Sequence, residues 1–108
     1  MKRLQQVSPR EAYAAYMLDT VLVDVRETND QNKKRADLSN LVSLPLSELS
    51  QRYSEVPANK PVVFISKIGK KGREAAQFMV QHGYDNVAIL DGGLKAWEEE
   101  GLPVRDRK

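Results

Sequence analysis

The chain has 108 residues, a formal net charge of +2, 41% hydrophobic residues and 30% charged residues. This length accommodates one hydrophobic core, so we predict a single domain over residues 1–108. The small net charge gives no reason to expect nucleic acid or a membrane as a partner. Because the sequence contains no cysteine, disulfides, thiolate metal sites and cysteine catalysis are excluded for the chain as written.

The sequence also lacks the signals of membrane insertion, secretion and cofactor binding. No apolar run approaches the ~18 residues of a membrane span. The N-terminal stretch MKRLQQVSPRE has no apolar core of a signal peptide. No metal-ligand cluster and no nucleotide fingerprint is visible. We therefore expect a cytoplasmic protein with no metal and no cofactor.

The first 40 residues predict a helix, a buried strand and an irregular connection. Ser8, Pro9 and Glu11 have the pattern of an N-cap, a first-turn proline and a capping box, so a helix should run to about Met17. The residues expected to face inward are Ala12, Ala15, Tyr16 and Met17. The β-branched run at residues 20–25 predicts a buried strand. Residues 26–40 are polar and without periodicity, which predicts a mobile connection.

The remaining residues predict a regular alternation of strands and helices. Pro45 introduces a small helix, Gly83 is placed to end an amphipathic one, and Asp91 is a candidate cap for the last one. Gly101 and Pro103 should stop that last helix. The expected strands are 42–44, 62–66 and 86–90, and the expected helices are 46–53, 74–81 and 94–100.

This alternation predicts the fold class and the edge at which a ligand would bind. Strands joined by helices through short turns indicate parallel βαβ units in a three-layer α/β sandwich. In such folds ligands gather at the carboxyl ends of the strands. The turns after Val25, Ile65 and Leu90 are therefore the places where a site is expected.

The turn after Ile65 has the composition of an anion site. Its sequence is SKIGKKGR, with no acid in the stretch. Gly69 and Gly72 allow successive backbone N–H groups to point inward, and a helix is expected directly afterwards. Backbone donors and cations together predict binding of a small anion such as sulfate, thiosulfate or phosphate. The cations are Lys67, Lys70, Lys71 and Arg73.

Ser66 stands where such a turn usually presents a reactive atom. A serine hydroxyl needs an adjacent base, and the only histidine, His82, is expected at the far end of the next helix, roughly 15 Å away along its axis. A Walker P-loop is excluded by Phe64 and Lys71 at the positions that require glycine and serine or threonine. A protein-tyrosine-phosphatase pattern lacks both its cysteine and an arginine in step.

Several conspicuous residues have simpler structural interpretations. We expect Asp24 and Arg26 to form hydrogen bonds and an ion pair at the end of the first strand. The alternative is an acid–base set of Asp24, Arg26 and Glu27. Trp97 is expected in the core and His82 at a helix C-terminus. The basic stretch at residues 32–35 is either an exposed loop or a contact for an acidic protein partner.

Five segments together resemble the single-domain rhodanese family, in the right order and over about residues 5–104. The resemblance implies an α/β sandwich around a mostly parallel sheet of about five strands. In active members a cysteine after the apolar strand accepts sulfur from a donor such as thiosulfate, holds it as a persulfide and passes it to an acceptor. The segments are VLVDVRE (21–27), LPLSEL (44–49), KPVVFIS (60–66), HGYDNVAILDGGLKAW (82–97) and GLPV (101–104).

The resemblance assigns the loop and places serine at the position of the nucleophile. Asp24, Arg26 and Arg73 are its expected supporting residues. Oxygen cannot replace sulfur in thiol–disulfide-type exchange, so the chain should not transfer sulfur as written. The loop positions are Ser66, Lys67, Ile68, Gly69, Lys70, Lys71 and Gly72.

Two further departures bear on whether Ser66 is natural or an engineered replacement. The segment ADLSNL (36–41) stands where the family usually has GHIPGA, and Lys71 stands where the loop often ends in arginine. These differences favour a natural inactive member that binds an anion or a protein. The alternatives are an active sulfurtransferase represented by its Cys→Ser form, and a hydrolase of phosphate or sulfate esters that uses Ser66.

Overall fold

A computed structural model of the chain describes residues 4–106. The predicted single domain over residues 1–108 also includes residues 1–3 and 107–108. These lie outside the described residues, and for them the domain assignment stays a prediction. Within residues 4–106, no helix combines the length and apolar character needed to cross a membrane.

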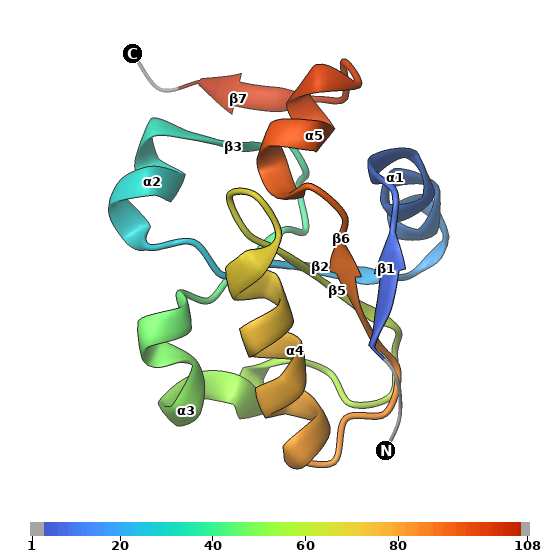
Figure 1. Cartoon of the computed structure of the whole chain (residues 1–108), viewed down its shortest axis with the longest axis vertical. Helices are drawn as coiled ribbons and strands as arrows, with labels where there is room; N and C mark the ends of the chain where they lie inside the picture. The colour runs from blue at the N-terminus through green and yellow to red at the C-terminus, as the bar shows by residue number, and fades with distance from the viewer. Residues whose placement is uncertain (1–3, 107–108) are drawn as a thin grey trace.

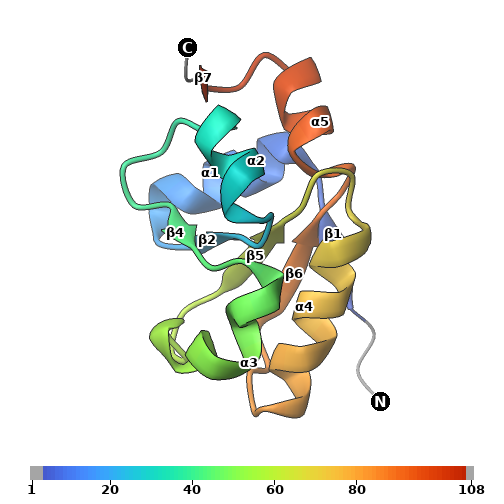
Figure 2. The same cartoon turned by 90° about the vertical axis from the view of Figure 1, so that its left-hand side faces the viewer.

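The central feature is a five-stranded, fully parallel sheet in the order β1-β6-β5-β2-β4 (Figures 1 and 2). A separate pair of short antiparallel strands, β3 and β7, lies beside α5. The predicted α/β class and the mostly parallel five-stranded sheet are confirmed. The strands are β1 (Gln5–Val7), β2 (Val21–Asp24), β3 (Lys34–Ala36), β4 (Val42–Ser43), β5 (Val62–Ile65), β6 (Val87–Leu90) and β7 (Val104–Asp106).

Helices cover both faces of the sheet and complete three layers. Helices α3 and α4 lie on one face, and α1 and α5 lie on the other (Figures 1 and 2). The helices are α1 (Pro9–Leu18), α2 (Thr28–Lys33), α3 (Leu49–Arg52), α4 (Lys70–Gln81) and α5 (Gly93–Glu99), and 3₁₀ turns at Leu46–Glu48 and Tyr53–Glu55 flank α3.

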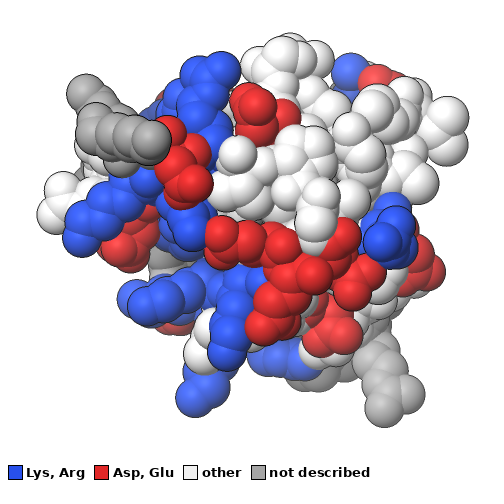
Figure 3. Space-filling model, turned by 90° about the horizontal axis from the view of Figure 1, so that it is seen from above, with Lys and Arg blue, Asp and Glu red and all other residues white. Residues whose placement is uncertain are grey.

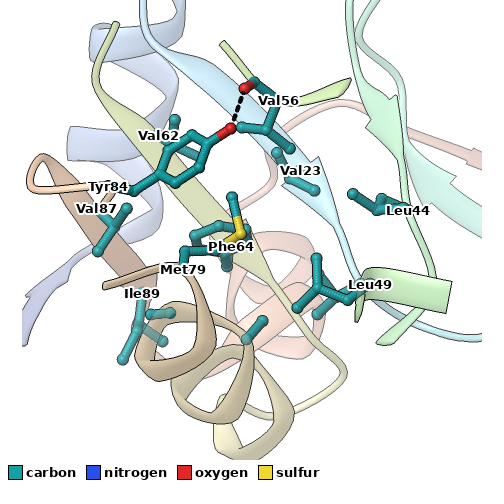
Figure 4. Close-up of a cluster of buried hydrophobic side chains, with 13 residues drawn as sticks. Val23, Leu44, Leu49, Val56, Val62, Phe64, Met79, Tyr84, Val87 and Ile89 are labelled. Atoms are coloured by element: carbon teal, nitrogen blue, oxygen red, sulfur yellow. Dashed lines mark hydrogen bonds between the residues drawn. The ribbon is translucent and has the colours of Figure 1, made fainter. Parts of the chain in front are cut away.

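Strand alternation explains the two hydrophobic cores. Successive side chains of β5 point to opposite faces, so Phe64 joins the core under α4 while Val63 and Ile65 join the core under α1 and α5. Figure 4 shows the first core, where Met79 of α4 packs near Phe64. The phenol of Tyr84 closes its edge by donating to the Val56 carbonyl at 2.6 Å.

The N-terminus of α1 forms as its sequence predicts. The Glu11 N–H donates to the Ser8 hydroxyl at 3.1 Å, and the Ser8 N–H donates to the Glu11 carboxylate at 2.8 Å. This reciprocal pair confirms the capping box. The prediction that Met17 faces inward is wrong, because its side chain is 63% exposed near the end of the helix.

The prediction of an irregular connection over residues 26–40 is also wrong. Helix α2 and strand β3 occupy most of it. Gln31 is buried, and its amide donates to the backbone carbonyls of Asp24 and Arg26 at 3.2 and 2.6 Å. Because this order depends on contacts with distant residues, a polar segment without periodicity gave no local signal for it.

Smaller differences concern where elements begin. Helix α4 begins at Lys70, four residues before the predicted start, because Gly69 in a left-handed conformation (φ +108°) allows the chain to turn straight into the helix. Strands β1 and β7 were not expected and form by pairing with β6 and β3. Gly83 follows the end of α4 with a φ of +92°, as expected for a helix C-terminus.

Candidate functional site

The predicted site lies at the carboxyl edge of the sheet, after the central strand β5. Ser66 follows Ile65, the last residue of β5, and the loop runs from there to the start of α4, beside α5 (Figure 1). Ser66 is only 2% exposed. The side chain at the nucleophile position is therefore enclosed by the loop.

The Ser66 hydroxyl is held by the loop backbone. Its oxygen accepts a hydrogen bond from the Gly69 N–H at 2.8 Å. A Cβ atom at Gly72 would lie 3.4 Å from the same oxygen and 3.3 Å from the Phe64 carbonyl oxygen, so the first turn of α4 passes close to the serine. The glycines thus allow the backbone to close around one electronegative atom.

Helix α5 fixes the loop from its other side. Its Leu94 N–H donates to the Ser66 carbonyl at 2.8 Å, and its Lys95 N–H donates to the Lys67 carbonyl at 3.2 Å. A Cβ at Gly93 would lie 2.4 Å from the Ser66 carbonyl oxygen. Glycine at this position is therefore required for the two backbones to approach.

The prediction that Asp91 caps α5 is wrong. The N-cap is Gly92, and no side chain caps it. Two N–H groups in the first turn of α5 instead donate to loop carbonyls, so tertiary contacts replace the local cap. The positive φ values of Gly92 and Gly93, +75° and +64°, confirm the predicted tight turn.

Asp24 and Arg26 form a buried ion pair at the end of β2. The Arg26 Nη2 atom lies 2.9 Å from Asp24 Oδ2, and the backbone N–H of Arg26 donates to Asp24 Oδ1 at 3.0 Å. The guanidinium also donates to the Lys34 carbonyl of β3 at 2.5 Å. Burial raises the pKa of the Asp24 carboxyl, while the hydrogen bonds and charge of Arg26 oppose that shift. The predicted ion pair at this corner is confirmed.

Arg26 and the loop face one cavity. A cavity of about 290 Å³ is lined by Arg26, Lys67 and Ile68 together with residues of α2 and α5. The lysines that join Lys67 there are Lys33 and Lys34, from the basic stretch at residues 32–35, and Lys95, which the sequence did not single out. Arg73 lies elsewhere and lines a smaller cavity of about 200 Å³ with Gly69 and Lys70.

The four predicted cations of the loop lie close together along the chain and are free of ion pairs with the described residues. Within residues 4–106, no salt bridge involves Lys67, Lys70, Lys71 or Arg73. Seen from above, lysine and arginine side chains gather mainly on the left, both above and below a central group of acidic residues (Figure 3). The geometry therefore leaves these positive charges available to an anion.

His82 takes the structural position expected for it. It is the C-cap of α4, its Nδ1 lies 2.9 Å from the Phe78 carbonyl oxygen, and its ring stacks on Phe78 at 4.1 Å. Ser66 precedes the opposite end of this 12-residue helix, which is about 18 Å long. Since His82 is the only histidine of the chain, Ser66 has no imidazole base.

Trp97 is a core residue, as predicted. Its side chain is fully buried and its indole N–H donates to the Pro103 carbonyl at 2.8 Å. Among residues 4–106, no three His, Cys, Asp or Glu side chains come together as a metal site.

Residues 8–100 match the family described as "Rhodanese-like domain". A sulfurtransferase of Allochromatium vinosum is 31% identical over 86 residues, which cover 80% of this chain and 78% of that protein. The thiosulfate sulfurtransferase GlpE of Actinobacillus pleuropneumoniae serotype 3 is 42% identical over 50 residues, or 46% of each chain.

Solved structures give the same result. A rhodanese-related protein from Thermoplasma volcanium superposes with a TM-score of 0.83 at 26% identity, covering 94% of this chain and 97% of that one. The polysulfide-sulfur transferase homodimer from Wolinella succinogenes gives a TM-score of 0.84 at 25% identity, covering 97% and 80%. The fold, the order of the motifs and these matches show that the protein belongs to the rhodanese-like domain family, as a member without any cysteine.

Proposed function

We propose that this rhodanese-like domain does not transfer sulfur and that it binds a small anion at the loop formed by residues 66–72. The observation that supports the proposal best is the hydrogen bond from the Gly69 N–H to the Ser66 oxygen. It shows the loop amide directed at an electronegative atom, while the atom there is an oxygen that cannot carry sulfur.

The charge around the loop supports an anionic ligand. Lys67, Lys70 and Lys71 are exposed, and α4 begins at Lys70 so that its first N–H groups lie at the same end. Helix N-termini and glycine-turn amides favour negative charge. Sulfate, thiosulfate and phosphate carry the charge and oxygen acceptors that such donors need. A protein partner that presents an acidic group is the other ligand of this class.

The test of inactivity is sulfur transfer from thiosulfate to cyanide, measured for the unaltered chain and for Ser66→Cys. We expect no turnover by the serine form. Turnover by Ser66→Cys, with a persulfide detected by intact mass, would mean that the loop keeps the transfer geometry. Turnover by the serine form would contradict the proposal.

The test of anion binding is a titration with sulfate, thiosulfate and phosphate, followed through the amide NMR signals of residues 66–72. We expect saturable shifts that weaken as the salt concentration rises. The double variant Lys70→Gln/Lys71→Gln should bind more weakly, because it removes two positive charges of the loop itself. Two results would contradict a specific site. One is that chloride causes the same shifts as sulfate, and the other is that the double variant binds as tightly as the unaltered chain.

A second candidate is an active sulfurtransferase represented here by its Cys→Ser form. The enclosed Ser66 and the bond to Gly69 N–H are compatible with it, because the loop keeps a compact turn around the side chain. Turnover by Ser66→Cys would favour it, and cysteine at this position in the source gene would establish it. A cytoplasmic location stays part of both proposals.

A further inference from the structure

A separate cavity lies between α1 and the segment that leads from β3 to β4. Its volume is about 640 Å³, within the range of roughly 300–1,000 Å³ for small-molecule sites. Neither Ser66 nor any lysine of the 66–72 loop lines it. A ligand in this cavity would therefore be recognised by different residues from the anion proposed above.

One side of the cavity is apolar. Tyr13, Tyr16 and Met17 of α1 line it together with Leu38 and Leu41. The Met17 side chain is 63% exposed, although a methionine of this helix would be expected to pack inward. An apolar ligand would cover the surface that these side chains leave open to water.

The apolar side chains are held in place before any ligand binds. The Tyr16 hydroxyl accepts from the Asn40 N–H at 3.2 Å and lies 3.3 Å from the Ser39 hydroxyl, which ties α1 to the opposite wall. The Tyr13 ring packs edge-on against buried Trp97, with ring centroids 5.7 Å apart. A pre-formed cavity saves the ordering cost that would otherwise reduce affinity.

The other side of the cavity holds two arginines in an unfavourable arrangement. Arg35 of β3 is directly opposite Arg105 of β7 in the antiparallel pair. Like charges directly opposite on neighbouring strands are destabilising. The adjacent pair, Lys34 and Asp106, has opposite charges 3.6 Å apart. Like charges therefore face one another at the Arg35–Arg105 pair and not at the neighbouring Lys34–Asp106 pair.

The two arginines have one salt bridge between them in the part of the chain that the structure describes. Arg105 Nε lies 3.5 Å from Asp37 Oδ1, and no salt bridge within residues 4–106 involves Arg35. Both guanidinium groups also line a neighbouring cavity of about 290 Å³. The acids that line the two cavities are Asp37 and Asp106, and Asp106 is paired with Lys34 at 3.6 Å. Arg35 is thus the lining cation that has no salt bridge within residues 4–106.

We propose that this cavity binds an amphipathic anion with one acid group. The acid group lies between the guanidinium groups of Arg35 and Arg105, which bind carboxylate, sulfonate or phosphate through paired N–H donors. The apolar body lies against Tyr13 and Tyr16. One negative charge on the ligand relieves the repulsion between the arginines and gives Arg35 a salt-bridge partner, which no residue in 4–106 provides.

The probe for this site is anilinonaphthalenesulfonate, an aromatic sulfonate whose fluorescence rises in apolar surroundings. We expect saturable binding of one probe per chain. Arg35→Glu should weaken it by about tenfold or more, since it replaces an attractive charge with a repulsive one. The same variant places opposite charges at the strand pair, so its midpoint of urea unfolding should not fall. Retained folding distinguishes loss of the site from loss of structure.

The matched control is Lys60→Glu, which makes the same change in net charge. The described ion pair of Lys60 is with Asp19, at an exposed position outside the cavity lining. Probe affinity should be unchanged in this variant. An equal weakening in both variants, or no weakening by Arg35→Glu, would overturn the proposal because binding would then reflect overall charge or apolar surface alone.

Competition identifies the source of the ligand. Octanoate represents a free apolar acid, and a capped Leu-Leu-Asp peptide represents an acidic segment of a protein. Displacement of the probe by either supports the site, and the stronger competitor indicates the source. Displacement by neither would overturn the assignment to amphipathic anions. Sulfate, which has no apolar body, should shift the amides of residues 66–72 and leave the probe bound, so failure of one proposal is distinguishable from failure of the other.

Discussion

The Ser66 oxygen lies 2.8 Å from the backbone nitrogen of Gly69 and accepts its hydrogen bond. The two residues belong to one turn, and Gly69 adopts a left-handed conformation that directs its N–H back toward the start of the loop. The same atom position would hold a sulfur nucleophile in a chain with cysteine there. In this chain the oxygen takes part in the structure of the loop.

Ser66→Ala should destabilise the folded protein. It removes the acceptor of the Gly69 N–H in a partly buried turn, and an unsatisfied donor costs about 1–3 kcal/mol. Urea unfolding measures the free energy of unfolding. Ser54→Ala, at an exposed residue beside α3, is the control and should change it by no more than about 0.5 kcal/mol. Equal effects of the two substitutions would show that the bond to Gly69 contributes nothing.

Gly93→Ala should disrupt the contact between α5 and the loop. The new Cβ would lie 2.4 Å from the Ser66 carbonyl oxygen and 2.6 Å from the Lys67 carbonyl carbon, at a φ of +64°. Because backbone atoms must move, we expect a loss of about 3 kcal/mol or more. Thermal unfolding should show a midpoint lower by at least about 12 °C.

The matched control for this prediction is Gly83→Ala. Gly83 also has a positive φ of +92°, but a Cβ there meets nothing within 4 Å. It should cost about 1–2 kcal/mol, the conformational penalty alone. If both alanine variants lose the same stability, close packing of α5 on the loop is not what requires Gly93.

Asp24→Asn should be strongly destabilising. It leaves the Arg26 guanidinium, which is 7% exposed, without its counter-charge, and removing one partner of a buried pair costs about 3–5 kcal/mol. Lys34→Gln breaks the solvent-accessible pairs with Glu98 and Asp106 and should cost no more than about 1 kcal/mol. Chemical denaturation of both variants checks this order. A smaller loss of unfolding free energy for Asp24→Asn than for Lys34→Gln would contradict a stabilising role of the buried Asp24–Arg26 pair.

The capping box of α1 should make stability depend on acid. The hydrogen bonds from the backbone N–H and the hydroxyl of Ser8 lower the pKa of the Glu11 carboxyl below its ordinary value of 4.5. The folded state therefore favours the carboxylate, so this contribution is present above pH 4.5 and is lost as the pH falls through the lowered pKa.

Glu11→Gln tests this dependence because glutamine keeps the capping pattern but does not titrate. The stability difference between the unaltered chain and Glu11→Gln should shrink as the pH is lowered from 7 through about 4. An NMR titration of the Glu11 carboxyl should give a midpoint below 4.5. A midpoint at or above that value would contradict the assigned hydrogen bonds.

The chain's local patterns determined much of the fold and of the candidate site. The β-branched runs predicted β2 and β5 within one or two residues, and Ser8 with Glu11 predicted the start of α1. These signals are local because strand alternation and helix capping depend on neighbours in the sequence. The absence of cysteine, read from composition alone, removed the sulfur nucleophile from consideration.

Tertiary contacts decided the features that the patterns missed. The order of residues 28–36 depends on the amide of Gln31, which reaches backbone carbonyls five and seven residues away, and on the pairing of β3 with β7. Asp91 has the residue type of a helix cap, but the first N–H groups of α5 donate to the loop after β5 instead.

The pairing of Arg35 with Arg105 is the clearest case of this difference. The two residues are 70 positions apart in the sequence, and nothing in either neighbourhood indicates that they face one another. A sequence determines the preferences of each segment because those preferences arise from adjacent residues. Only the folded chain determines which side chains meet across segments, since strand register and packing bring distant positions together.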